Sequence, residues 1–254
     1  MDLLVEDRPG NEPAANLALE EALVRAGPQR ALLRVWQNST CVVVGRGQRV
    51  DREVDLAACR RDGVPVLRRA SGGGTVYQDL GNLNVTLVAP GRHPELPRKL
   101  ARLLTDAIGE LGLEATIRER GVFVGPRKVS GLAMQVTGTG TLAHATLLVT
   151  TRAQLVSAYL AATPSDPQPL DSRRAPVAPL RAHKSSVDIK AAAAAVRLVA
   201  ASHYVPPLPR RPRAAERHWQ ARLRHERYDH PSWHLTGRPR ETPWTTRLAS
   251  TSTA

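Results

Sequence analysis

The sequence predicts an α+β fold in which helices and strands are mixed. Residues 16–26 and 97–111 repeat apolar side chains at the spacing of amphipathic helices. Short apolar runs, such as residues 41–44, lie between them and have the length and composition of strands. These runs do not alternate regularly with helices, as they would in a doubly wound parallel sheet. The order of the elements therefore favours α+β over α/β.

The first part of the chain is predicted to hold two helices and three strands. Residues 16–26 form the first helix, and residues 31–36 and 41–44 are strands joined by a polar turn. Residues 51–62 form a helix that ends at a glycine, a residue that readily adopts the left-handed conformation found after helices. Residues 64–67 then lead as a strand into a glycine-rich loop.

The same patterns continue to about residue 202. Apolar runs bounded by turn residues predict strands at 75–77, 84–88, 122–124, 128–134 and 146–149. Helical spacing predicts helices at 97–111, 152–161 and 189–202, the last of which is rich in alanine. Residues 163–179 contain five prolines among mostly polar residues, which predicts a loop or linker.

We expect two unequal parts. Residues 1–204 form one domain, and residues 205–254 form a basic tail that is partly ordered at best and lacks a full accessory domain. The basic tail has ten arginines against four acids and shows no clean helical period. It supplies six of the thirteen net positive charges, so the charge of +13 does not by itself predict that the whole protein binds nucleic acid.

The number of cysteines and the N-terminal residues indicate in which cellular compartment the protein is expected. Cys41 and Cys59 cannot build a disulfide framework, and neither has a second ligand at metal-binding spacing. The first residues lack a secretory pattern, and no apolar run approaches 18 residues. We therefore expect a cytoplasmic protein without a membrane partner.

The glycine-rich loop is the first candidate site. Arg68 and Arg69 precede Ser71 and three consecutive glycines, Gly72, Gly73 and Gly74. Glycines let backbone N–H groups approach an anion, and arginine offers paired donors to phosphate or carboxylate. The sequence of this loop does not match the P-loop, dinucleotide-binding or nucleophile-elbow patterns. A plain flexible turn is the alternative.

A lysine motif follows about fifty residues later. Lys128 lies within a predicted strand and is followed by Ser130, Gly131 and Ala133, with His144 further along. A lysine among small residues is unusual for a solvated charge. The alternative is an edge-strand lysine that discourages aggregation.

The two motifs in this order resemble the lipoate-protein ligase family, and the resemblance covers residues 11 to about 198. Five segments carry it: residues 16–21, residues 43–48, the arginine–glycine loop with its continuation at residues 79–84, the lysine motif, and residues 144–148. The resemblance implies a mixed, largely antiparallel sheet flanked by helices, as in biotin ligases and the class II synthetase core. It implies an enzyme that forms lipoyl-adenylate from ATP, with Mg²⁺, and transfers the lipoyl group to a lysine of a carrier protein.

The resemblance also assigns residues. Lys128 is the catalytic residue. The residues expected at the adenylate are Arg69, Gly74, Thr75, Val76, Tyr77, Asn82 and Asn84. The residues expected at the acyl substrate are Arg68, Ser71, Gly72, Gly73, Ser130, Gly131, Ala133 and His144. Asp79 is the expected Mg²⁺ ligand, although a turn-forming role suits it and the two asparagines equally well.

Two other functions stay open. Octanoyl or lipoyl transferases of the same superfamily work without ATP through a cysteine downstream of the lysine motif, but no cysteine follows Cys59. A non-catalytic paralogue that binds acyl groups or nucleic acid is suggested by the net charge and by Gln78 and Ala145, which depart from the His and Gly of the family. The carrier is expected to be a lipoyl domain or an H-like protein. Because no accessory domain is recognised after Val205, either a separate accessory subunit or the use of a preformed adenylate is expected.

Overall fold

The centre of the fold is a mixed sheet of eight strands. The structure, a computed structural model, describes residues 2–4, 10–119, 121–162, 165–203 and 208–239, and its strand order there is β11-β1-β2-β6-β10-β9-β8-β7. The strands are β1 (Asp2–Leu4), β2 (Leu32–Trp36), β6 (Asn82–Pro90), β7 (Thr116–Arg118), β8 (Gly121–Val124), β9 (Arg127–Val136), β10 (Gly140–Leu148) and β11 (Leu208–Arg210). Within this sheet, β2, β6, β10, β9, β8 and β7 pair antiparallel with their neighbours in that order. Strand β1 instead pairs parallel with both β2 and β11. The predicted largely antiparallel α+β fold is confirmed.

A smaller sheet lies beside the large one. It contains β3 (Cys41–Val44), β4 (Val66–Arg68) and β5 (Val76–Gln78), in the order β4-β3-β5. Strand β3 is fully buried, which explains its unbroken run of apolar residues. The glycine-rich loop joins β4 to β5, so both of its ends are held by this sheet.

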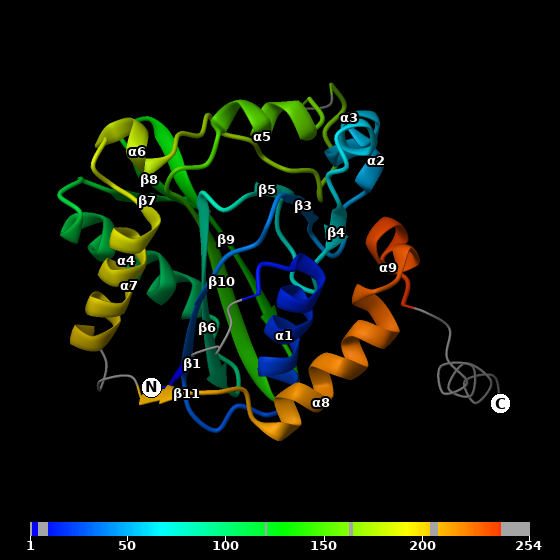
Figure 1. Cartoon of the computed structure of the whole chain (residues 1–254), viewed down its shortest axis with the longest axis horizontal. Helices are drawn as coiled ribbons and strands as arrows, with labels where there is room; N and C mark the ends of the chain where they lie inside the picture. The colour runs from blue at the N-terminus through cyan, green and yellow to red at the C-terminus, as the bar shows by residue number, and fades with distance from the viewer. Residues whose placement is uncertain (1, 5–9, 120, 163–164, 204–207, 240–254) are drawn as a thin grey trace.

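Helices cover both faces of the large sheet (Figure 1). Helices α4 (Leu96–Glu110) and α7 (Ile189–His203) pack on each other and against one face. Helix α1 (Pro13–Arg25) covers the other face, and α8 (Ala214–Leu223) packs along α1. The remaining helices are α2 (Val50–Glu53), α3 (Leu56–Arg61), α5 (Ala153–Tyr159), α6 (Leu180–His183), the π-helix η1 (Arg224–Tyr228) and α9 (Pro231–Thr236).

Successive side chains of the central strands point to opposite faces of the large sheet, and so belong to different apolar clusters. Ala143, Ala145 and Leu147 of β10 join the core under α4 and α7. Leu142 points the other way and packs with residues of α1. His144, which lies between these positions, therefore faces the same side of the sheet as α1.

Two predictions of secondary structure differ from the structure. The single helix predicted at residues 51–62 is wrong, because Val54 is extended, pairs with Leu160 and separates α2 from α3. Asp55 then caps α3 by accepting a hydrogen bond from the Ala58 N–H at 2.9 Å. The helices α8 and α9 were not predicted.

The described part of the basic tail folds onto the rest of the chain. Trp233 of α9 is only 1% exposed and packs in a cluster with Leu17, Trp36 and Leu67. Several arginines of this segment form ion pairs with acids, namely Arg210, Arg213, Arg222, Arg224 and Arg227. The domain boundary at residue 204 stays a prediction.

Within the described ranges, no helix combines the length and the apolar character that crossing a bilayer requires.

Candidate functional site

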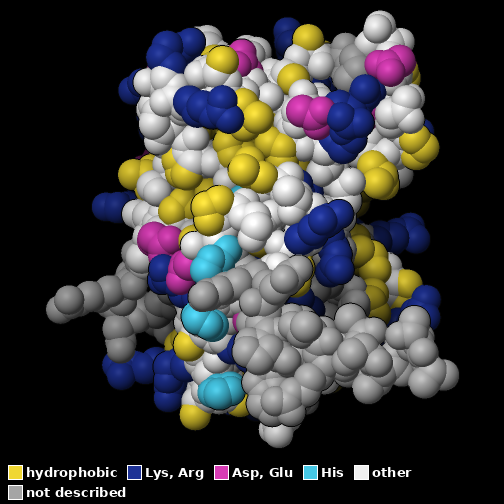
Figure 2. Space-filling model, turned by 90° about the vertical axis from the view of Figure 1, so that its right-hand side faces the viewer, with side chains coloured by type: hydrophobic (Ala, Val, Ile, Leu, Met, Phe, Trp, Pro, Cys, Tyr) yellow, Lys and Arg dark blue, Asp and Glu magenta, His cyan; other side chains and the backbone are white. Residues whose placement is uncertain are grey.

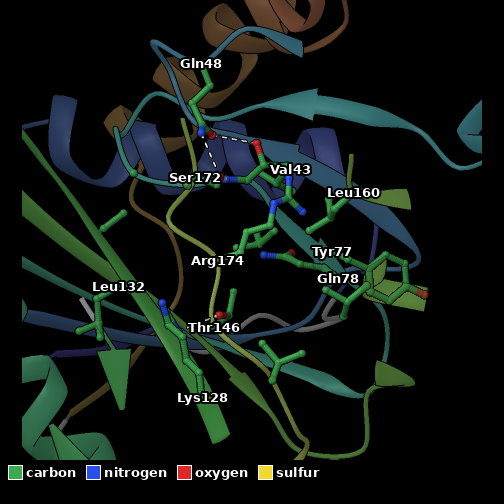
Figure 3. Close-up of a pocket in the computed structure, with 18 of the residues that line it drawn as sticks. Val43, Gln48, Tyr77, Gln78, Lys128, Leu132, Thr146, Leu160, Ser172 and Arg174 are labelled. Carbon is green, nitrogen blue, oxygen red and sulfur yellow. Dashed lines mark hydrogen bonds between the residues drawn. The ribbon is translucent and has the colours of Figure 1, made fainter. Parts of the chain in front are cut away.

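A cavity of about 680 Å³ lies between the two sheets (Figure 3). Strands β6, β9 and β10 line one side, the β4–β5 loop lines another, and α5 with residues 169–177 completes the wall. Thirteen of the predicted site residues line it: Arg69, Gly72, Gly73, Gly74, Thr75, Val76, Tyr77, Asn84, Lys128, Ser130, Gly131, Ala133 and His144. Four do not line it: Arg68, Ser71, Asp79 and Asn82.

Lys128 enters the cavity from β9. Its backbone N–H donates to the Pro176 carbonyl at 2.9 Å, and its carbonyl accepts from the Ala178 N–H at 3.2 Å. Its side chain runs over two glycines: a Cβ at Gly121 would lie 2.5 Å from Lys128 Cε, and one at Gly131 would lie 3.8 Å from Nζ. The absence of a side chain at Gly121 thus leaves the space that the side chain of Lys128, labelled in Figure 3, occupies.

Arg69 holds the glycine-rich loop from within. Its Nη2 donates to the carbonyls of Gly72 and Gly74 at 2.7 and 2.8 Å. Its Nη1 donates to the Val43 carbonyl at 3.2 Å, and its Nε donates to Ser71 Oγ at 3.0 Å. Burial lowers the pKa of Arg69 to about 10. Three of these four bonds end on the loop, and the fourth anchors the guanidinium to β3.

Arg68 has a different task, outside the cavity. Its Nη1 donates to the carbonyls of residues 45, 46 and 48, and its Nε and Nη2 donate to those of residues 233–235. The side chain thus joins the turn after β3 to α9. This explains how a guanidinium that is 2% exposed avoids the cost of unsatisfied donors.

Glu20 is a buried carboxylate that the sequence analysis did not select. It lines the cavity from α1, and its Oε2 accepts from His144 Nδ1 at 2.8 Å. Burial alone would raise the pKa of Glu20, but the neighbouring His144, the Thr86 hydroxyl and Arg34 together lower it. The opposite nitrogen of the imidazole, Nε2, lies 2.8 Å from Ser71 Oγ.

Amide side chains form another polar wall. Gln78 Nε2 donates to Asn84 Oδ1 at 3.0 Å, and Asn82 Nδ2 donates to the same oxygen at 3.1 Å. Gln78 thus takes part in the cavity where the family often has histidine. Among the described residues, Asn82 Oδ1 and Ser130 Oγ are buried without a hydrogen-bond partner. Of these two residues only Ser130 lines the cavity, so its hydroxyl is suited to a ligand.

The proline-rich segment forms part of the site, which the sequence analysis missed. Ser172 Oγ accepts from Gln48 Nε2 at 3.0 Å (Figure 3), and the Ser172 N–H donates to Glu53 Oε1 at 2.6 Å. Arg174 Nη2 lies 3.2 Å from Glu53 Oε2, and Arg174 lines the cavity. The carboxylate of Glu53, which is 1% exposed, therefore fixes this segment to α2.

Asp79 lies in a turn. Its Oδ1 accepts from the Gly81 N–H at 2.8 Å, and its Oδ2 accepts from the Arg152 N–H at 3.4 Å. In the part of the chain that the structure describes, no three His, Cys, Asp or Glu residues gather as a metal site would require. The role of Asp79 in holding Mg²⁺ stays a prediction.

Comparison with known proteins identifies the family. Residues 12–200 match the family model for the lipoyl protein ligase A/B catalytic domain. Over 147 residues the chain is 42% identical to a curated protein of Aeropyrum pernix that is named for lipoate-protein ligase A, and the match spans 56% of each protein.

Solved structures agree with this. A bi-partite lipoate protein ligase of Thermoplasma acidophilum, described with its E2 lipoyl domain, is 27% identical, with a TM-score of 0.78 over 95% of this chain and 98% of that one. A lipoate-protein ligase A described as bound with ATP is 25% identical, with a TM-score of 0.80 over 92% of this chain and 98% of that one. The chain belongs to the lipoyl protein ligase A/B catalytic domain family.

Proposed function

We propose that this protein is an ATP-dependent lipoate-protein ligase, which forms lipoyl-adenylate and transfers the lipoyl group to a lysine of a carrier protein. One observation carries the proposal: Lys128, the glycine-rich loop and an apolar wall of Leu17, Trp36 and Val43 line the same cavity. An apolar wall suits an acyl chain, while a cation and backbone donors suit a carboxylate and a phosphate.

The proposed reaction has two steps. An oxygen of the lipoate carboxylate attacks the α-phosphorus of ATP, and the bond to pyrophosphate breaks. The amine of the carrier lysine then attacks the acyl carbonyl, loses a proton and releases AMP. Negative charge develops on phosphate or carbonyl oxygens in both steps, and the ammonium group of Lys128 stabilises it. Gly72, Gly73 and Gly74 bring the backbone close to the adenylate.

The cysteines argue against the ATP-independent transferase. Cys41 is 0% exposed and Cys59 is 2% exposed, and neither lines the cavity. Burial raises the pKa of both thiols, which disfavours the thiolate that an acyl-enzyme mechanism needs.

The relatives support the substrates and the partner. The ATP described in the ligase A structure supports adenylation by this chain. The E2 lipoyl domain described with the Thermoplasma acidophilum ligase supports a lipoyl domain as the carrier, and the bi-partite nature of that ligase supports a separate accessory subunit. Mg²⁺ is proposed to accompany the phosphates of ATP.

The distribution of charge on the surface supports nucleic-acid binding less than the cavity supports a ligase. On the face that carries α2, α3 and α9, Lys and Arg side chains are scattered among hydrophobic and acidic ones rather than gathered in one stripe (Figure 2). Several arginines of the described part of the tail also form ion pairs with acids of the same chain, such as Arg210 with Glu216.

The test is direct modification of a carrier. The purified protein is incubated with ATP, Mg²⁺, lipoate and an apo lipoyl domain, with and without a candidate accessory subunit, and the carrier is measured by intact mass spectrometry. The proposal expects the lipoyl mass increment only when ATP is present. Modification from a lipoylated donor protein without ATP would instead establish the transferase.

A further inference from the structure

Two hydrogen-bond paths meet at the buried carboxylate of Glu20. On one path, Arg69 Nε donates to Ser71 Oγ at 3.0 Å, Ser71 Oγ lies 2.8 Å from His144 Nε2, and His144 Nδ1 lies 2.8 Å from Glu20 Oε2. On the other path, Trp36 Nε1 donates to Thr86 Oγ1 at 3.0 Å, and that hydroxyl donates to Glu20 Oε1 at 2.6 Å.

The chemistry of Glu20 and Arg69 fixes the two ends of the first path. An ionised carboxylate only accepts, so the proton on Nδ1 of His144 points to Glu20. Nε2 faces the hydroxyl of Ser71: a neutral imidazole accepts a hydrogen bond from that hydroxyl, and an imidazolium donates one to it. The remaining lone pairs of that hydroxyl are available to Arg69. The path therefore runs from the guanidinium to the carboxylate without a conflict between donors.

Serine, histidine and glutamate in this order have the connectivity of a nucleophilic triad, but the surroundings do not suit one. Ser71 is 2% exposed and does not line the cavity. Its oxygen also accepts from Arg69, which holds it in the wall. The path acts as a brace because its far end, Arg69, holds the carbonyls of Gly72 and Gly74.

We infer that Glu20 is a positioning residue, which acts through His144, Ser71 and Arg69 to hold the Gly72–Gly74 loop in the shape that binds the nucleotide. The inference deepens the proposed function and rests on it for the identity of the ligand. An amide at position 20 would have to place its NH₂ group toward Thr86 or toward His144. In the first case the Thr86 hydroxyl loses its acceptor. In the second case His144 Nδ1 must accept, Nε2 then donates to Ser71, and the Ser71 hydroxyl loses its acceptor.

The test uses two variants and one matched control. Glu20→Gln removes the charge, and Ser71→Ala cuts the path at Arg69 without changing α1. Glu21→Gln is the control, because Glu21 is also buried on α1, at 2% exposed, but binds Arg25, Arg227 and Tyr228 instead of the cavity residues. Thermal unfolding and circular dichroism verify that each variant is folded.

Two measurements are made on the full chain. Calorimetric titration with ATP should show about tenfold weaker binding for Glu20→Gln and for Ser71→Ala. The double variant should bind ATP as well as the single variant with the lower affinity does, because both substitutions cut the same path. Hydrogen exchange of peptides covering residues 69–76 should be faster in both variants. Glu21→Gln should bind ATP like wild type and leave this exchange unchanged.

The outcomes separate the two proposals. Wild-type exchange in the loop of Glu20→Gln and Ser71→Ala, or losses of ATP affinity that multiply in the double variant, would overturn the positioning role. A wild-type protein that does not bind ATP would overturn the proposed function, while faster exchange in the two variants would still support the brace.

Discussion

The side-chain oxygen of Ser172 accepts a hydrogen bond of 2.9 Å from the backbone N–H of Thr75. The two residues are 97 positions apart in the sequence. Gly74 permits the approach, because a Cβ at that position would lie 2.9 Å from the same oxygen. The contact joins the proline-rich segment to the glycine-rich loop, so the two form one wall of the cavity.

Ser172→Ala is expected to loosen this wall. The substitution removes the acceptor of the hydrogen bonds from Thr75 and from Gln48, and each lost bond costs about 0.5–1.5 kcal/mol. We expect a higher KM for ATP, about tenfold, and faster proteolysis within residues 165–177. Ser165→Ala, an exposed change in the same segment, is the control. An unchanged KM would show that the wall does not contribute to nucleotide binding.

Lys128→Ala is expected to reduce carrier modification by about 10²- to 10³-fold, the usual effect of removing one preorganised donor. The fold should be retained, because the side chain lies over glycines and its backbone bonds do not depend on it. Intact mass spectrometry of the carrier checks the first statement, and circular dichroism checks the second. Lys99→Ala is the control, since Lys99 is exposed on α4 and pairs with Glu95. Activity close to that of wild type would refute the assignment of Lys128.

The fold was predictable where local pattern and burial agree. Helices α1 and α4 and the strands around Lys128 follow from apolar periodicity. Helices α8 and α9 were missed because few of their side chains are apolar and buried. Leu223 and Trp233 are two of them, and η1, which joins the two helices, is held to α1 by the ion pair of Arg227 with Glu21. Such contacts depend on residues about 200 positions away, which a local pattern cannot show.

In the site, too, residues in local motifs could be predicted and residues that depend on distant contacts could not. The glycine-rich loop and Lys128 were recognisable because they lie in compact motifs. Glu20 and Ser172 were not selected, although Glu20 lies in a segment that carried the family resemblance. Their roles depend on His144 and on Thr75, which only the folded chain brings within 3 Å. The two adjacent arginines also looked equivalent in the sequence, whereas only Arg69 lines the cavity and Arg68 bonds the carbonyls of Gly45 and Trp233.

Replacing both cysteines by alanine is expected to leave modification of the carrier intact. The thiols are buried in two separate apolar clusters and do not line the cavity. Alanine is preferred to serine here because an unpaired buried hydroxyl costs about 1–3 kcal/mol. Intact mass spectrometry of the carrier checks the result. An acyl-enzyme that forms in wild type and is lost in this variant would favour the transferase.

Glu216→Gln is expected to destabilise the protein in a pH-dependent way. Burial alone would raise the pKa of Glu216, but hydrogen bonds from Arg210 and Arg213 lower it. A carboxylate with a lowered pKa adds stability above its unfolded value, about 4.3, and that stability is lost as the pH falls through the folded value. Urea unfolding should show a loss of about 1.5–3 kcal/mol at pH 7 and a smaller one at pH 3.

The control for this variant is Glu226→Gln, whose carboxylate forms a partly exposed pair with Arg222. Such pairs contribute about 0–1 kcal/mol, so little change is expected at either pH. Equal losses for Glu216→Gln at pH 7 and pH 3 would mean that the substitution acts through packing rather than through the charge.

Trp233→Ala is expected to destabilise the whole protein and not only the basic tail. The indole is 1% exposed in a cluster with Leu17 and Leu67, and its Nε1 donates to the Arg68 carbonyl at 2.9 Å. Truncating a buried tryptophan costs about 3–5 kcal/mol. Trp219→Ala, a half-buried change on α8, should cost less. Differential scanning calorimetry should therefore show one transition at a lower temperature for Trp233→Ala. If instead a separate low-temperature transition appears while the main one stays in place, residues 208–239 unfold independently, and the boundary predicted at residue 204 is a true domain boundary.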